Sequence, residues 1–265
     1  EALILLKIIA DGFLTHDRPI TRPIDDSVLR VVHGQEFLLR RARGFAPLPL
    51  YIKETQTSVL AVGAHLKNTV AQTIGNKIFL SQHVGDLDTV ETFSVFKKTT
   101  QLFSTLYNQT PKAVACDLHP RYLSTQFVQD LGLPLIFIQH HYAHVLSVMT
   151  ENDIEGPVLG VAWDGTGLGD DGTLWGGEFL RVDEHSYKRV ASFRPFRLPG
   201  QETAIKEPKR AALGLLYELL GDSLWERKDL DILKLFSENE IQSLSLMLKN
   251  NLRTSWTSSA GRLFD

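Results

Sequence analysis

The segment 139–144, which reads QHHYAH, holds the side chains best suited to chemistry in this sequence. If it forms a helix, His140 and His144 lie four residues apart, so both imidazole rings share one face and can bind one metal ion. Position 141 is histidine rather than glutamate, so the zinc-protease pattern with its glutamate base is absent. His141 points away from the shared face and is expected to be structural or to support the ligands. Two histidines at this spacing are also common as surface or capping residues, and that alternative stays open.

Asp164 is the third candidate ligand for the same metal ion. It follows an expected buried strand and opens the glycine-rich segment 164–169, so its carboxylate should lie at a strand end. Two imidazoles and one carboxylate suit zinc or iron and leave coordination positions open for substrate. An Asx-type turn that caps the strand would explain the Asp-Gly pair equally well.

Two polar loops could bind phosphate groups through backbone N–H groups. Loop 63–69 and loop 164–169 each follow an expected strand, although neither matches the P-loop pattern. Lys67 could place a positive charge on a phosphate, whereas an exposed loop lysine is the plain alternative. The segment 175–178, WGGE, would let a ligand approach the backbone, and a tight hairpin would explain its glycines as well. The predicted catalytic residues are Lys67, His140, His144 and Asp164. The predicted nucleotide-binding residues are Gly63, Lys67, Asn68, Thr69, Gly165, Thr166, Gly167, Gly176, Gly177 and Glu178.

Two similar halves of the chain must position these residues. The first half is predicted to open with three strands, the second and third joined by a hairpin at Gly75-Asn76. Helices and strands then alternate up to a helix at 140–151. The predicted elements of the first half are strand 58–62, a second strand, strand 77–83, helix 88–108, strand 112–116, helix 121–131, strand 134–138 and helix 140–151. Those of the second half are strands 157–163, 173–182 and 187–196, followed from residue 204 by mainly helical sequence.

A meander of three strands, with a polar loop after its first strand, is thus predicted twice. This is the layout of the duplicated actin-like ATPase fold, an α/β fold of the ASKHA or ribonuclease H-like type, whose two lobes hold a nucleotide between them. We expect the first lobe at about 57–153 and the second from about 154. Residues 1–14 have apolar positions suited to a helix, and prolines indicate a linker near 47–53.

Composition narrows the class of protein. The chain of 265 residues is 43% hydrophobic and 22% charged, as expected for a soluble protein with a core. No apolar run approaches the roughly 20 residues that span a bilayer, and the start does not have the pattern of a signal peptide. A net charge of −3 gives no overall attraction to nucleic acid. We therefore expect neither membrane nor nucleic acid as a partner.

The single cysteine, Cys116, cannot form a disulfide within the chain, which is consistent with a reducing cytoplasm. It lies in the apolar run 113–116, which favours a buried strand residue. Any thiol chemistry at this site is therefore expected to use a cysteine of a partner. Both ends of the sequence look cut, so a fragment of a longer protein is expected.

Distinctive motifs occur along nearly the whole chain, in the segments 16–20, Arg22 with 25–28, 40–44, 63–69, 81–87, 117–120, 122–125, 140–144, 164–167, 175–178, 207–208 and 258–265. As a set and in this order, they resemble the HypF family of carbamoyltransferases, which act in the maturation of nickel–iron hydrogenases. The resemblance implies that residues 1–50 are the C-terminal end of a YrdC-like domain. It implies that residues 51–265 belong to a TsaD-like carbamoyltransferase domain that is truncated at its C-terminus.

The resemblance also implies a reaction. ATP, with Mg²⁺, and carbamoyl phosphate would give carbamoyl-adenylate, whose carbamoyl group passes to the C-terminal cysteine of HypE for synthesis of the cyanide ligands. The metal histidines of the family fall on His140 and His144 and its first aspartate ligand on Asp164, while a further aspartate belongs to a C-terminal part that this sequence lacks. The fragment is therefore not expected to be fully active alone. His65 and Gln201 depart from the family pattern, where glutamate and glycine are usual.

Three other functions fit parts of the sequence. A tRNA threonylcarbamoyl transferase shares the fold and the His-x-x-x-His motif, but lacks a YrdC-like tail followed by the Lys67 loop. An O-carbamoyltransferase differs in its acceptor. An actin-like ATPase that acts as a conformational binding module predicts ATP binding without a histidine-bound metal, and leaves the paired histidines unexplained.

Overall fold

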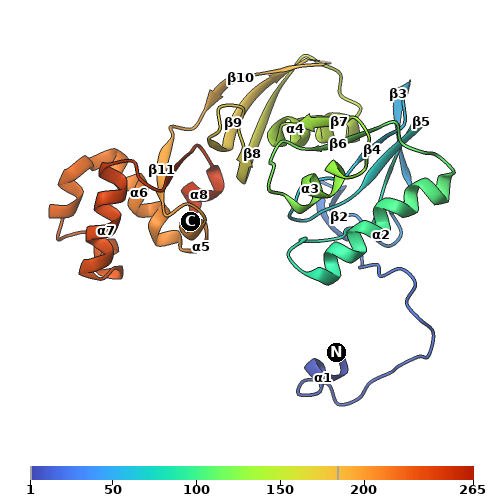
Figure 1. Ribbon diagram of the computed structural model, residues 1–265, viewed down its shortest axis with the longest axis horizontal. Coiled ribbons are helices and arrows are strands. Elements are labelled where there is room, and N and C mark those ends of the chain that lie inside the picture. The colour runs from blue at the N-terminus through green and yellow to red at the C-terminus, as the bar shows by residue number, and fades with distance from the viewer. Residues whose placement is uncertain (1, 184) are drawn as a thin grey trace.

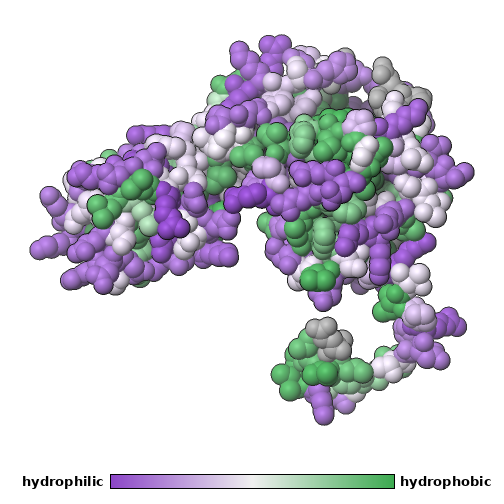
Figure 2. Space-filling view, in the orientation of Figure 1, coloured by the Kyte–Doolittle hydropathy of each residue, from purple (hydrophilic) through white to green (hydrophobic). Residues whose placement is uncertain are grey.

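The computed structural model describes residues 2–183 and 185–265, which form an N-terminal segment followed by two α/β lobes (Figure 1). The N-terminal segment contains helix α1 (Ala2–Leu6) and the antiparallel strands β1 (Val28–Val32) and β2 (Gln35–Arg40). The prediction of a helix over residues 1–14 is wrong beyond Leu6. So short a helix is marginal without packing, and Ile8 and Leu14 next to it are almost fully exposed. Figure 2 shows this apolar surface around α1.

The first lobe is a mixed sheet in the order β3-β5-β4-β6-β7, with helices packed on it. Strands β4, β6 and β7 run parallel, and β5 pairs with β4 and β3 in the antiparallel sense. Its strands are β3 (Pro49–Gln56), β4 (Val59–Ala61), β5 (Ala71–Leu80), β6 (Ala113–Asp117) and β7 (Leu135–Ile138). Its helices are α2 (Val90–Tyr107), α3 (Leu123–Gln129) and α4 (His140–Glu151). The carboxyl ends of β4, β6 and β7 therefore meet at one edge.

The predicted hairpin at Gly75-Asn76 is wrong, because β5 runs straight through it. Gly75 has a positive φ of 60° and lies opposite Gln56, where the pairing of β3 with β5 is irregular. The strand that pairs with β5 at the edge of this sheet is β3, which begins within the predicted linker at 47–53. An edge strand tolerates Pro49, since the missing N–H is not required by a second neighbour.

The second lobe begins with the predicted meander of β8 (Val158–Leu168), β9 (Leu174–Val182) and β10 (Tyr187–Ser192). Strand β8 extends through most of the predicted 164–169 loop, with an irregularity between Trp163 and Gly167. The helical part is interrupted by β12, which was not predicted and pairs with β11 and with the start of β9. The remaining elements are β11 (Phe196–Pro199), α5 (Glu202–Lys206), α6 (Pro208–Leu220), η1 (Gly221–Glu226), η2 (Asp231–Leu235), α7 (Glu238–Lys249), β12 (Thr254–Thr257) and α8 (Ala260–Phe264).

Helix α4 connects the two lobes, since it begins where β7 of the first lobe ends and packs on the sheet of the second (Figure 1). Val145 of α4 lies in a core cluster with Ala162 of β8 and Leu180 of β9. Gly160 makes the approach close, because a Cβ there would lie 2.4 Å from Val145. Within the described part of the chain, no helix has both the length and the apolar character needed to cross a membrane.

Candidate metal centre and its cavity

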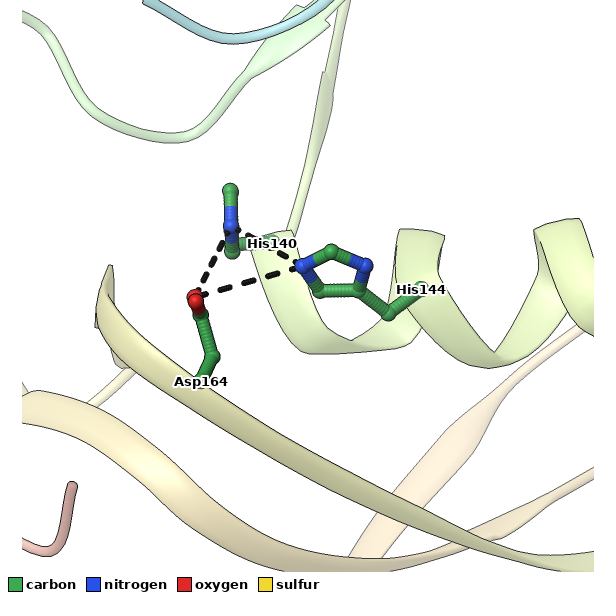
Figure 3. A group of neighbouring side chains, drawn as sticks. All are labelled: His140, His144 and Asp164. Atoms are coloured by element: carbon green, nitrogen blue, oxygen red, sulfur yellow. Dashed lines mark hydrogen bonds and ion pairs between the residues drawn. The ribbon is translucent and has the colours of Figure 1, made fainter. Parts of the chain in front are cut away.

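His140 and His144 lie on the first turns of α4, as the spacing predicted. The side chain of Gln139 accepts the N–H of Tyr142 at 2.9 Å and so fixes the start of the helix at His140. The Nε2 atoms of His140 and His144 are 3.2 Å apart. Oδ2 of Asp164, on β8, lies 3.1 Å from Nε2 of His140 and 3.9 Å from Nε2 of His144. Figure 3 shows the three side chains pointing toward one another.

Asp164 reaches this position because β8 passes very close to α4. A Cβ on Gly167 would lie 2.5 Å from Cε1 of His141 and 2.9 Å from Cβ of His140, so only glycine fits. From the other side, the hydroxyl of Ser259 contacts the carbonyl oxygens of Asp164 at 2.8 Å and of Gly165 at 2.6 Å. The backbone that carries the carboxylate is thus held between α4 and α8.

The donor set fits a divalent cation. Oδ1 of Asp164 accepts the N–H of Gly165 at 2.6 Å, whereas Oδ2 is buried and receives no hydrogen bond. One ligand atom from each of His140, His144 and Asp164 lies within 4.8 Å of the others. An unsatisfied buried carboxylate oxygen that faces two imidazoles is what a zinc or iron ion would satisfy.

The side chains of the cluster shift one another's pKa values. Burial lowers the pKa of His140, but the hydrogen bond to Asp117 and the nearby carboxylate of Asp164 outweigh it and raise the pKa to about 9. Burial, and then the charge of His140, lowers the pKa of His141 to about 4 and also lowers the pKa of His144. Burial raises the pKa of Asp164, but His140 outweighs it and the net shift is downward. Without a metal, His140 is therefore protonated below about pH 9, and its positive charge lies between the carboxylates of Asp117 and Asp164.

His141 is fully buried and does not share the face of the other two histidines. The amide of Gln139 donates to its Nδ1 at 3.1 Å, which leaves the proton of the neutral ring on Nε2, 3.8 Å from Oδ2 of Asp164. This distance is too long for a hydrogen bond. A structural or supporting role for His141 stays a prediction.

A cavity of about 640 Å³ opens beside the cluster, between the two lobes. Its volume is typical of a pocket for a small molecule. Lys67 has a positive φ of 48° in the loop that follows β4, and its N–H donates to Asp86 at 2.7 Å. Asn68 is buried and uses its amide to bind the carbonyls of Val62 and Ala64, so it shapes the loop. The predicted residues on the cavity wall are Gly63, Lys67, Asn68, Thr69, His140, His144, Asp164, Gly165 and Thr166.

The other predicted nucleotide-binding residues do not lie on this wall. Gly167 packs against the histidines from behind. A Cβ on Gly176 or on Gly177 would lie 2.5 Å or less from a backbone oxygen. Glu178 is fully buried and accepts the N–H groups of both glycines at 3.0 and 3.1 Å. Nucleotide binding by these four residues stays a prediction. The contacts of Gly176, Gly177 and Glu178 hold β9 against the segment before α8.

Among the lining residues that were not predicted as site residues are Asp117, Tyr122 and Arg262. Arg262 donates to the carbonyl of Ile205 at 3.2 Å and pairs with Asp265, while its Nε is buried without a hydrogen-bond partner. It adds a cation from the second lobe to Lys67 of the first. The segments 117–120 and 258–265 stood out in the sequence, but no local pattern placed them at this cavity.

Comparisons with known proteins agree with one another. The family model described as the HypF Kae1-like domain matches residues 54–151, and the model described as the second subdomain of the carbamoyltransferase Kae1-like domain matches residues 160–265. The carbamoyltransferase HypF of Synechocystis sp. is 47% identical to this chain and covers 100% of it, but the match covers 36% of that protein.

Two solved structures are also similar to the chain. The crystal structure of full-length HypF in the phosphate- and nucleotide-bound form gives a TM-score of 0.90 at 40% identity, over 99% of this chain and 41% of that one. The crystal structure of T. kodakarensis HypF gives 0.85 at 35% identity, over 98% of this chain and 35% of that one. The chain thus spans between about a third and two fifths of the length of these relatives.

Proposed function

Because this chain belongs to the HypF family of carbamoyltransferases, we propose that its cavity transfers a carbamoyl group in the maturation of nickel–iron hydrogenases. In this proposal water hydrolyses carbamoyl phosphate to carbamate and phosphate, and carbamate attacks the α-phosphate of ATP, with Mg²⁺, to give carbamoyl-adenylate and pyrophosphate. The acceptor of the carbamoyl group is the C-terminal cysteine of HypE. The observation that supports it best is that two cations and a metal-type cluster line one cavity between the lobes.

The cavity has the features that an acyl-adenylate requires. Lys67 and Arg262, from opposite lobes, supply positive charge for the phosphate. The loop that carries Lys67 can fold back tightly at the cavity wall because Gly63 has a positive φ of 65° and a Cβ there would lie 2.6 Å from the carbonyl oxygen of Thr69. Tyr122 and Ile138 add an apolar wall that excludes water from the reacting group.

A zinc or iron ion held by His140, His144 and Asp164 would supply a Lewis acid for an oxygen of the carbamoyl-adenylate. The chain itself fixes the positions of these ligands. Gln139 sets the start of α4, and Gly167 allows β8 to approach that helix. In this proposal the carbamoyl group lies at the cluster and the phosphate at Lys67, which line the same cavity.

The nucleophile in this proposal comes from the partner. Cys116 lines the cavity but is only 3% exposed, and burial followed by the charge of Asp117 raises the pKa of its thiol, so it is a poor thiolate. The thiol of HypE loses its proton to solvent, and its thiolate attacks the carbamoyl carbon. The C–S bond forms, the C–O bond to the phosphate breaks, and AMP leaves with the electron pair.

Mass spectrometry of HypE tests this function. The intact protein is incubated with ATP, Mg²⁺, carbamoyl phosphate and HypE, and we expect one carbamoyl group on the C-terminal cysteine of HypE. His140→Ala and His144→Ala should abolish the adduct, while His185→Ala, at an exposed histidine between β9 and β10, should not. An adduct that persists in both cluster variants would show that the histidines are structural. Modification of tRNA with threonine and bicarbonate, without a HypE adduct, would instead favour a threonylcarbamoyl transferase.

A further inference from the structure

Asp117 lies behind His140, on the side of the imidazole ring away from the cluster. Its Oδ2 accepts a hydrogen bond from Nδ1 of His140 at 2.7 Å, while Nε2 of the same ring faces Asp164 at 3.1 Å. A carboxylate can only accept, so the proton of this bond belongs to the histidine. The two nitrogens of His140 therefore have different tasks, one toward Asp117 and one toward the cluster.

Asp117 is itself held firmly. It is the last residue of β6, which pairs with β4 on one side and β7 on the other. Its Oδ1 accepts the N–H of His119 at 2.8 Å, and its carbonyl oxygen accepts the hydroxyl of Thr125 at 3.2 Å. Its side chain is only 5% exposed. A carboxylate with both oxygens engaged and its backbone inside a sheet can hold a neighbouring ring in one orientation.

We propose that Asp117 is a positioning residue, which keeps the proton of neutral His140 on Nδ1 and directs the Nε2 lone pair to the metal position beside Asp164. A histidine ligand commonly donates its second N–H to a carboxylate, which fixes the ring and makes the ligand more basic. This inference rests on the proposed function only for the presence of a metal. It adds a residue that the donor set of His140, His144 and Asp164 does not contain.

His140 and His144 differ in whether Nδ1 of the ring is hydrogen-bonded. Among the described residues, no hydrogen bond is made to Nδ1 of His144, and its side chain is 54% exposed. The chain also offers a matched pair elsewhere, because Nε2 of His65 lies 2.8 Å from Oδ1 of Asp88. This second pair has the same chemistry but does not face Asp164, so Asp88 provides a control for the general effect of losing a carboxylate next to a histidine.

Metal binding and NMR spectroscopy of the intact protein test the proposal without any measurement of carbamoyl transfer. Zinc affinity is measured against a competing chelator, in mildly alkaline buffer, for the wild type, Asp117→Asn, Asp117→Ala and Asp88→Asn. Long-range proton–nitrogen spectra of the zinc-loaded protein report which ring nitrogen of His140 carries the proton. Circular dichroism checks folding, and Asp117→Asn, which keeps the shape of the side chain, replaces Asp117→Ala if that variant does not fold.

We expect both Asp117 variants to bind zinc roughly 10- to 100-fold more weakly than the wild type, and Asp88→Asn to bind it normally. In the wild type, Nδ1 of His140 should carry the proton, and this signal should shift or broaden in Asp117→Asn. Unchanged affinity in both variants, an equal loss in Asp88→Asn, or a proton on Nε2 would overturn the proposal. A wild type that binds no zinc would overturn it together with the metal part of the function, while the HypE assay would still report on transfer.

Discussion

Replacing Gly167 with alanine should separate β8 from α4 and so disturb the candidate metal centre. The added Cβ would lie 2.5 Å from Cε1 of His141 and 2.9 Å from two carbon atoms of His140. The φ of Gly167 is not in the left-handed region, so backbone strain does not contribute and the effect is purely steric. The strand and the helix must therefore move apart, or His140 must change its position.

The size of this effect follows from the contacts. An ordinary contact begins at 3.4 Å, so the atoms must separate by roughly 0.5 to 0.9 Å. Overpacking of this kind costs about 1–3 kcal/mol, or roughly 5- to 150-fold in the unfolding equilibrium constant. Metal–ligand distances tolerate only about 0.2 Å, so we also expect zinc affinity to fall by roughly tenfold or more.

Urea unfolding of the metal-free protein and zinc titration against a chelator measure the two effects separately. Gly12→Ala is the control for a glycine-to-alanine change, because Gly12 lies outside the site, a Cβ there would meet no atom within 4 Å, and its φ is not in the left-handed region. This control should unfold and bind zinc like the wild type. If Gly167→Ala also behaved like the wild type in both assays, the close packing of β8 on α4 would not hold the ligands, and our account of the site would be wrong.

Three further predictions concern the protonation of His140 and the buried carboxylate of Glu178. His140 has a pKa of about 9 and must lose its proton to bind a metal, so zinc affinity should rise about tenfold per pH unit from pH 7 to 9 and then level. A competition titration measures this affinity, and a flat pH profile would contradict the prediction. In the metal-free protein, protonated His140 stabilises the fold, and this contribution is complete below pH 6.5, the ordinary pKa of histidine. The contribution is lost as the pH rises through 9, which urea unfolding at several pH values can detect. Glu178→Ala should lower the free energy of unfolding by roughly 3–5 kcal/mol, because it removes the buried partner of Arg189 and the acceptor of the Gly176 and Gly177 N–H groups. Glu226→Ala, at an exposed position, should have little effect, and equal urea midpoints for the two variants would refute this.

Much of the fold was predictable because it depends on local patterns. Helix α4 begins and ends at the predicted residues, and β6, β7 and α2 lie within two residues of their predicted bounds. The actin-like α/β fold class and the HypF family are confirmed. The wrong predictions arose where a local signal competed with sheet pairing. The Gly75-Asn76 pair is typical of a hairpin, but β4 pairs with β5 before it and β3 pairs with Gly75 and with β5 after it, which keeps β5 continuous.

The candidate site likewise has features that local sequence patterns predicted and contacts that depend on tertiary packing. The sequence by itself determined the ligand types and the four-residue spacing of His140 and His144, since the geometry of one helix depends only on neighbours along the chain. It also indicated Asp164, through the strand that precedes it. Its contact with the two histidines, however, depends on β8 packing against α4, which Gly167 permits.

Only the tertiary structure decided which side chains surround these ligands. Asp117 is 23 residues from His140 in the sequence, and Ser259 is 95 residues from Asp164, yet both pairs are in hydrogen-bond contact. The same holds for Arg262, which reaches the cavity of the Lys67 loop from the opposite lobe. Contacts of this kind result from how sheets and helices pack on one another, and no periodicity along the chain records them.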